Sequence, residues 1–192
     1  MDEENLNETL TLDNAKDAYE QRLKERFGLN TYSWIQKNVN PLDTEFQKKF
    51  NAYYGINGAR RSVEWKNDYY DVFSTKTKES TFEEIIRDLS QKPNINRCEF
   101  SFASKMLHTY DDTKPIVDRN VLGFFNKEIE GSTLEEKIQS AIKIYSEIEN
   151  WYDSYLKTKD AKECIAFFDE TFPEFKSISN VKKIDFFIWL SM

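Results

Sequence analysis

The chain has 192 residues, of which 39% are hydrophobic and 15% aromatic, and its formal net charge is −7. This length suits one domain, which buries enough surface to fold without a metal or a disulfide. The acidic balance argues against tight, non-specific binding to duplex nucleic acid, because such binding depends on neutralising phosphates. Five glycines and four prolines are too few for the tight turns of a β-sandwich or barrel, so we predict an all-α fold.

The sequence carries no sign of secretion, membrane insertion or cofactor binding. Its first residues, MDEENLNETL, are acidic where a signal peptide is basic, and no apolar run approaches the roughly 20 residues of a membrane span. Cys98 and Cys164 lack a CxxC partner, so we expect two reduced thiols. No glycine-rich phosphate loop or metal-ligand spacing is present. We therefore expect a cytoplasmic protein with no cofactor, no metal and no membrane contact.

The first elements are predicted from caps and apolar stripes. Residues 1–12 are expected to form a flexible acidic arm, and residues 13–192 a single helical domain. Asp13 is predicted to cap a first helix that stops at Gly28. A second helix or turn is expected around Trp34, and a third is predicted to open at Pro41 and to end at Gly55. The stripe of the first helix consists of Tyr19, Leu23 and Phe27, and that of the third consists of Leu42, Phe46, Phe50 and Tyr54.

The later helices follow from further start signals. A helix around Trp65 follows the glycine-containing loop, and the pairs Ser80 with Glu83 and Ser132 with Glu135 match the capping-box pattern. Helices are also expected over residues 101–109, after an Asp118 cap, over 160–171, and over 179–190 behind a Ser179 cap. The total is about eight to ten helices with short connections.

Lys105 stands out because it lies in the middle of an apolar or small-residue helix. Burial on such a helix lowers the pKa of an amine, which makes it a nucleophile toward an electrophilic carbon. Asp118 follows 13 residues later at a predicted helix start, where exposed N–H groups keep a carboxylate ionised. Together the two groups can stabilise a cationic sugar intermediate. The alternative interpretation is a snorkelling lysine and an ordinary N-cap.

Two neighbours of Lys105 on the same helix are supporting candidates. Ser104 precedes it, and His108 follows three residues later on the same face. The alternative for His108 is a histidine at a helix end beside Tyr110. As the only histidine, with no cysteine nearby, it predicts no metal site.

The segment SFASKMLHTYDDTKPIVDRNV, residues 101–121, resembles the SF-x-SK…PI-x-D-x-x-V signature of small bacterial OGG-like proteins. FNAYYGINGARRSVEWKNDYYDVF, residues 50–73, and ISNVKKIDFFIWL, residues 178–190, resemble two further blocks of that family. These proteins are placed near the helix-hairpin-helix DNA glycosylases, which excise 8-oxoguanine. The resemblance spans roughly residues 42–190.

The resemblance implies an all-helical, two-lobed fold with a cleft, and a bifunctional glycosylase chemistry. Lys105 would be the Schiff-base nucleophile at the sugar C1′, and Asp118 the assisting carboxylate. Phosphate contacts would come from Arg60, Arg61 and Lys66. A flipped base would stack on Trp65 or Tyr54.

The chain also departs from the glycosylases. Residues 94–98 have no glycine where the glycine-rich, phosphate-gripping hairpin would lie, the spacing from Lys105 to Asp118 is shorter, and the net charge is acidic. These differences leave a single-stranded, nucleotide-sized or RNA substrate open, as well as a lost activity.

We therefore expect a DNA glycosylase/AP-lyase-like protein that acts on a damaged or modified base, with DNA favoured over RNA as its partner. One alternative is a non-catalytic nucleic-acid- or protein-binding module of a prophage or anti-phage defence system. Another is that Lys105 and Asp118 only fix the orientation of two helices.

Overall fold

The computed structural model describes residues 9–22 and 28–192, and within these ranges the chain is all-helical. The described residues form ten α-helices and one short 3-10 turn, with no strand, which confirms the predicted fold class. Cys98 and Cys164 are both free. In the described part of the chain, no helix combines the length and apolar character that a bilayer span requires.

The helices have the following bounds: α1 Leu12–Gln21, α2 Leu29–Lys37, α3 Thr44–Tyr53, α4 Val63–Ser74, α5 Phe82–Gln91, α6 Phe100–Tyr110, α7 Arg119–Phe124, α8 Leu134–Tyr155, α9 Lys159–Thr171 and α10 Asn180–Ser191. The 3-10 turn covers Pro173–Phe175.

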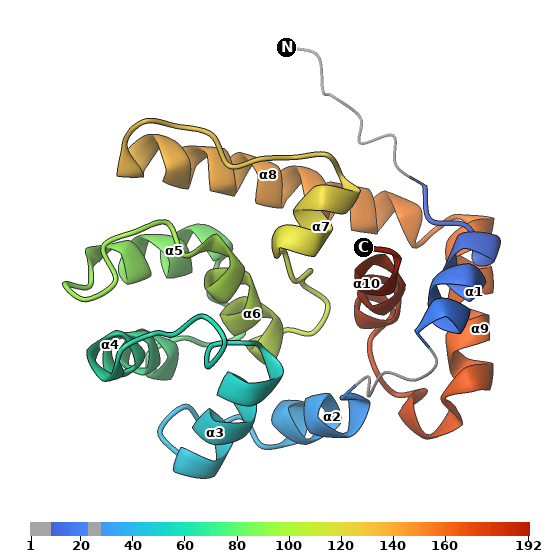
Figure 1. Ribbon diagram of the computed structural model, residues 1–192, viewed down its shortest axis with the longest axis horizontal. Coiled ribbons are helices and arrows are strands. Elements are labelled where there is room, and N and C mark those ends of the chain that lie inside the picture. The colour runs from blue at the N-terminus through green and yellow to red at the C-terminus, as the bar shows by residue number, and fades with distance from the viewer. Residues whose placement is uncertain (1–8, 23–27) are drawn as a thin grey trace.

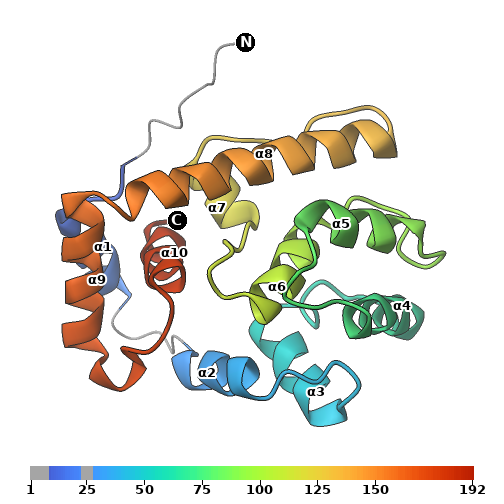
Figure 2. The ribbon, with the colours of Figure 1, turned by 180° about the vertical axis from the view of Figure 1, so that it is seen from behind.

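The helices fall into two groups, which Figure 1 shows from the front and Figure 2 from behind. One group contains α1, α9 and α10, which pack against each other. The other contains α4, α5 and α6, with α3 and α2 below them in Figure 1. The long helix α8 runs along the top of both groups and packs on α5. Helix α7 contacts α10 and α2 contacts α6, so the space between α6 and α10 is where the groups meet.

The first helix begins at another residue than predicted, while α2 contains Trp34 as expected. Thr11, rather than Asp13, caps α1 by accepting a hydrogen bond from Asn14 N–H. Leu10, which was predicted to belong to the flexible arm, is only 1% exposed and packs in the core. Gly28 has a left-handed φ of 66° and precedes α2, while the predicted stripe residues Leu23 and Phe27 lie outside the described residues.

Helix α3 starts three residues later than the sequence predicts. Asp43 caps it through a 2.7 Å hydrogen bond from Phe46 N–H, so Pro41 does not open the helix. Leu42, predicted on the apolar stripe, is consequently 74% exposed. The stripe residues Phe46 and Phe50 are fully buried, as predicted.

Both predicted capping boxes lie one residue further along the chain. Thr81 with Glu84 closes the box before α5, and Thr133 with Glu136 closes the box before α8. The Ser80 hydroxyl instead accepts the N–H of Thr77 in the preceding turn.

The Thr133 cap gives a direct test of this register. Replacing Thr133 with alanine removes the acceptor for the Glu136 N–H and is expected to lower the free energy of unfolding by about 1 kcal/mol. Urea denaturation followed by circular dichroism measures this loss. Ser132→Ala is the matched control and should stay within about 0.5 kcal/mol of the parent. A larger loss in Ser132→Ala than in Thr133→Ala would return the cap to the register expected from the sequence.

Candidate functional site

Lys105 lies at the middle of α6 and is almost completely covered, with 8% of its surface exposed. Its Nζ donates to the Ser101 hydroxyl at 3.0 Å and lies 3.5 Å from the Tyr54 carbonyl oxygen. The ring centres of Phe102 and Tyr54 are 5.2 and 6.0 Å from the same nitrogen. Within the described ranges no carboxylate forms an ion pair with it, so its nearest partners are all neutral.

The surroundings of Lys105 favour the neutral amine. Burial lowers the pKa of Lys105 below its usual value, because a charged group is costly to desolvate. Asp118 and Asp185 oppose this effect, and the positive charge of Lys182 adds to it. The charges of two carboxylates and a second lysine therefore act on Lys105, but none of the described carboxylates forms a direct ion pair with it.

An extended segment, residues 114–117, carries the chain from the end of α6 toward α7, and side chains hold its backbone. Ser104 Oγ accepts the Val117 N–H at 3.0 Å, with Val117 O at 3.2 Å. Tyr145 donates to Pro115 O at 3.1 Å. His108 Nδ1 lies 2.6 Å from Lys114 O. Ser104 and His108 thus fix the path of the backbone that leads to Asp118.

Asp118 caps α7, as predicted. Its Oδ1 accepts the N–H groups of Asn120 at 3.0 Å and Val121 at 3.2 Å. No hydrogen bond from the described part of the chain reaches Oδ2, and the residue is partly exposed. One carboxylate oxygen is therefore free to act on a ligand while the other fixes the side chain.

His108 is a neutral, fully buried histidine. Because the Lys114 carbonyl can only accept, Nδ1 carries the proton and Nε2 accepts from the Tyr32 hydroxyl at 2.8 Å. Burial, together with the nearby charge of Lys182, lowers the pKa of His108 to about 3. A positioning role fits this geometry, and a proton-transfer role at neutral pH does not.

Helix α10 contributes two charged groups that the sequence analysis did not assign to the site. Lys182 and Asp185 are 8% and 4% exposed and form an ion pair. Burial alone would lower the pKa of Lys182, but Asp185 together with Tyr53 and Tyr54 holds this pKa above its usual value. Burial raises the pKa of Asp185, and Lys182 opposes the effect. We call Lys105, Asp118, Lys182 and Asp185 the polar centre.

A signal for these two residues was present in the sequence. Lys182 and Asp185 interrupt the most apolar stretch of the chain at a spacing of three residues, which places them on one helix face. Buried charges of this kind are paired or functional.

Two buried tyrosine hydroxyls close to the polar centre have no hydrogen-bond partner within residues 9–22 and 28–192. Tyr54 is 7% exposed and Tyr152 is 1% exposed. Burial raises the pKa of both, and the charge of Asp185 contributes in each case. Both hydroxyls are therefore protonated, and each retains a free donor beside the centre.

The predicted nucleic-acid contacts lie at the start of α4 and the loop before it. Arg60 is exposed and has a left-handed φ of 51°. Lys66 is partly exposed and donates to Asn57 at 3.3 Å. Arg61 is already paired, through a 2.9 Å contact to the buried Glu99. Arg60 and Lys66 are thus the cations of this set that face solvent.

Trp65 and Tyr54, predicted to stack on a base, belong to the core in this structure. Trp65 is 2% exposed, its Nε1–H donates to Glu99 at 3.2 Å, and its ring stacks on Tyr69. Tyr54 packs against Phe50 at 4.6 Å between ring centres. Neither ring is open to a base. Tyr53, beside Tyr54, is the partly exposed aromatic side chain of this region.

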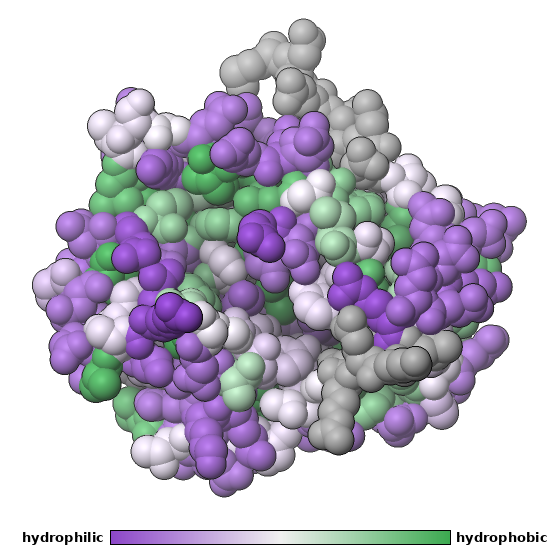
Figure 3. Space-filling view, in the orientation of Figure 1, coloured by the Kyte–Doolittle hydropathy of each residue, from purple (hydrophilic) through white to green (hydrophobic). Residues whose placement is uncertain are grey.

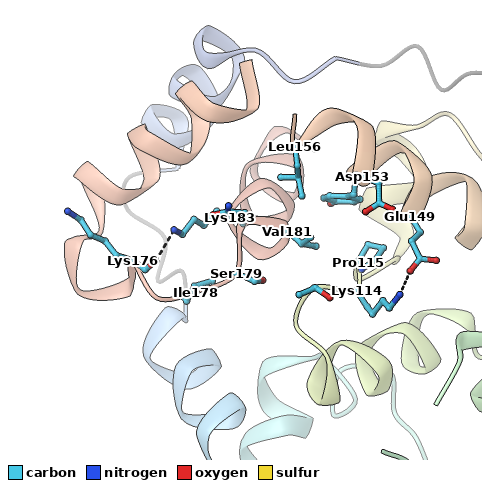
Figure 4. Close-up of a pocket in the computed structure, with 13 residues that line it drawn as sticks. Lys114, Pro115, Glu149, Asp153, Leu156, Lys176, Ile178, Ser179, Val181 and Lys183 are labelled. Atoms are coloured by element: carbon cyan, nitrogen blue, oxygen red, sulfur yellow. Dashed lines mark hydrogen bonds and ion pairs between the residues drawn. The ribbon is translucent and has the colours of Figure 1, made fainter. Parts of the chain in front are cut away.

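A cavity of about 490 Å³ lies behind the segment 114–117. Figure 4 shows Lys114 directed toward Glu149 of α8, and Lys183 of α10 directed toward the backbone of Lys176. Tyr152 also lines this cavity, but the four residues of the polar centre do not. Figure 3 shows that the face seen in Figure 1 is mainly hydrophilic and is hollowed near its centre.

The chemistry available at the polar centre is that of an amine and a carboxylate. Among the described residues no cluster of histidine, cysteine, aspartate and glutamate could hold a metal ion. A neutral amine can attack an electrophilic carbon, and a nearby carboxylate can stabilise the positive charge that develops. Comparison with protein-family models, with curated proteins and with solved structures finds no match for this chain.

Proposed function

We propose that the protein is a DNA glycosylase/AP-lyase-like enzyme in which Lys105 forms a Schiff base with a deoxyribose. The observation that carries this proposal is a buried lysine that has no ion pair with any described carboxylate, whose burial lowers its pKa, and whose amine is influenced by the charge of the partly exposed Asp118. An amine acts as a nucleophile when its pKa is lowered, and a nearby carboxylate stabilises the positive charge that its attack creates. The resemblance of residues 101–121 to OGG-like proteins supports the same assignment.

The reaction proposed has two stages. The neutral Lys105 amine attacks C1′ of the sugar while the bond from C1′ to the base breaks and its electron pair leaves with the base. The base takes up the proton that the amine loses. The sugar ring then opens: the nitrogen lone pair forms the C=N bond, the bond from C1′ to the ring oxygen breaks, and the ring oxygen takes up a proton from water. The product is the protonated imine, and the Asp118 carboxylate stabilises its positive charge. An abasic site enters at the second stage, because its aldehyde condenses with the amine and releases water.

Borohydride trapping tests this proposal. The protein is incubated with abasic single-stranded DNA, abasic duplex DNA and the corresponding RNA, and borohydride reduces any imine to a stable adduct that gel electrophoresis detects. We expect an adduct with DNA, and a loss of at least about 100-fold in Lys105→Met. Asp118→Asn keeps an N-cap residue and should slow adduct formation by about 100-fold.

Lys143→Met is the matched control, because Lys143 is a solvent-exposed amine on α8 and should not contribute. Peptide mass spectrometry should place the adduct on Lys105. An adduct that survives in Lys105→Met, or none with any abasic substrate, would defeat the proposal.

The second candidate is a non-catalytic binding module, favoured by the burial of Trp65 and Tyr54 and by the exposed apolar side chains of Leu42 and Val63. These two are 74% and 68% exposed, at the starts of α3 and α4. Binding of nucleic acid or a protein without an adduct, and unaffected by Lys105→Met, would support this candidate instead.

A further inference from the structure

The two lysines of the polar centre have the same exposure but unequal partners. Lys182 is 8% exposed, its ammonium contacts Asp185, and it lies 5.4 Å from the Tyr32 ring centre. Lys105 is also 8% exposed, yet it contacts only a hydroxyl, a carbonyl and ring faces. Asp185, the one fully buried carboxylate of the polar centre, is therefore paired with Lys182 and not with Lys105.

Titratable groups reach the polar centre from every element around it, but most of them are neutral. Burial lowers the pKa of His108 to about 3 and raises the pKa of each surrounding tyrosine. Glu99 at the start of α6 is paired with Arg61. The surrounding tyrosines are Tyr32 of α2, Tyr53 and Tyr54 at the end of α3, Tyr69 of α4 and Tyr152 of α8. Burial has the largest effect on the pKa of Lys105, and the charged groups that modify it are Asp118, Asp185 and Lys182.

We infer that Lys182 is a positioning residue for Lys105, because it holds the Asp185 carboxylate in an ion pair and so denies Lys105 a buried counterion. One buried carboxylate cannot compensate two ammonium groups, and an unpaired ammonium is costly in this environment. Lys105 is the amine that gives up its proton. The inference deepens the proposed function, since a neutral Lys105 is what that chemistry uses, but the state of the amine is measurable without nucleic acid.

Removing the charge of Lys182 should favour the protonated form of Lys105. In Lys182→Met the stem of the side chain is largely kept, while Asp185 is left without its partner. Lys105 then becomes the cation available to Asp185 and takes up a proton. In Lys182→Met with Asp185→Asn neither charge remains, and Lys105 should return to the neutral amine.

Reductive methylation with formaldehyde and cyanoborohydride measures the neutral amine. The amine condenses with formaldehyde, water leaves, and hydride from cyanoborohydride reduces the iminium to a methylamine. Peptide mass spectrometry across a pH series gives the rate at Lys105 alone. We expect Lys182→Met to slow this rate at neutral pH about 10-fold or more and to move its midpoint up by about 1 pH unit or more. The double variant should lie within about 3-fold of the parent.

Lys183→Met is the matched control, because Lys183 is equally buried on α10 but pairs with Asp169 at 2.7 Å, away from the centre. It should leave the Lys105 rate within about 3-fold of the parent. Asp185→Asn alone tests the inference even if Lys182→Met does not fold. In this variant the methylation rate of Lys105 should be no lower than in the parent. Circular dichroism verifies that each variant is folded.

The inference is overturned if folded Lys182→Met methylates at the parental rate, if the folded double variant stays as slow as the single, or if Asp185→Asn is 10-fold slower. Its failure differs from that of the proposed function. If the methylation rates follow the expected pattern but no abasic substrate gives an adduct, the inference is supported and the proposed lyase activity is contradicted. If Lys105 forms the adduct but its methylation rate does not change in Lys182→Met, the proposed lyase activity is supported and the inference is contradicted.

Discussion

Replacing Phe50 with alanine is expected to lower the free energy of unfolding by about 3 to 5 kcal/mol, the range for deleting a fully buried phenylalanine. Phe50 is 0% exposed, and its ring centre lies 4.6 Å from that of Tyr54, 5.2 Å from Phe73 and 5.6 Å from Phe46. These rings leave little room for the neighbours to collapse into the space that the substitution creates. Urea denaturation followed by tryptophan fluorescence and circular dichroism gives the change.

Leu42→Ala is the matched control, because the sequence pattern places Leu42 on the same stripe as Phe50. The structure leaves Leu42 74% exposed, so its replacement should change stability by less than about 0.5 kcal/mol. A loss in Leu42→Ala comparable with that in Phe50→Ala would mean that α3 begins at Pro41 and packs in the register expected from the sequence.

Acidification should destabilise the protein through His108 by about 3 kcal/mol between pH 7 and pH 4. The folded state holds this imidazole neutral, with a pKa lowered from 6.5 to about 3, because it is buried and hydrogen-bonded on both sides. Below pH 6.5 the unfolded chain takes up a proton that the folded chain excludes. Stability therefore falls as the pH drops from 6.5 toward 3, and His108 contributes no slope above pH 6.5.

His108→Asn isolates this contribution, because the asparagine amide can donate to Lys114 O but does not titrate. The variant should be less stable than the parent at pH 7, and its stability should depend less on pH between 6.5 and 4. Denaturation at a series of pH values gives both curves, and their difference cancels the carboxylates that the two proteins share. Parallel curves would show that His108 is protonated in the folded state.

The helices could be predicted from local sequence because caps and stripes act over a few residues. Asp118 and Ser179 cap α7 and α10 as expected. The two capping boxes were displaced because each site offers two overlapping solutions, a serine and then a threonine, followed by two glutamates. Local chemistry does not separate these registers. The contacts of the preceding turn decide at α5, where Ser80 already accepts the Thr77 N–H.

The candidate site was predictable only in the part that is local in sequence. Lys105 and Asp118 are separated by one helix turn and one extended segment, so a single stretch of sequence contains both. Lys182 and Asp185 lie on α10, which packs on α7 from the other group of helices, and no spacing rule encodes this long-range contact. Trp65 was assigned to base stacking from the family resemblance. Its sequence pattern is equally compatible with a core aromatic, and its contacts with Glu99 and Tyr69 place it in the core.

The extended segment 114–117 depends on side chains for hydrogen bonds to its backbone. In a sheet, a neighbouring strand would satisfy such a backbone whatever its side chains were, and substitutions would be tolerated. Here the backbone of the segment is hydrogen-bonded by three side chains instead: Ser104 and His108 of α6 and Tyr145 of α8. The path of the chain that leads to Asp118 therefore depends on three side chains from two other elements, and the loss of any one of them leaves a backbone group of this segment without its partner.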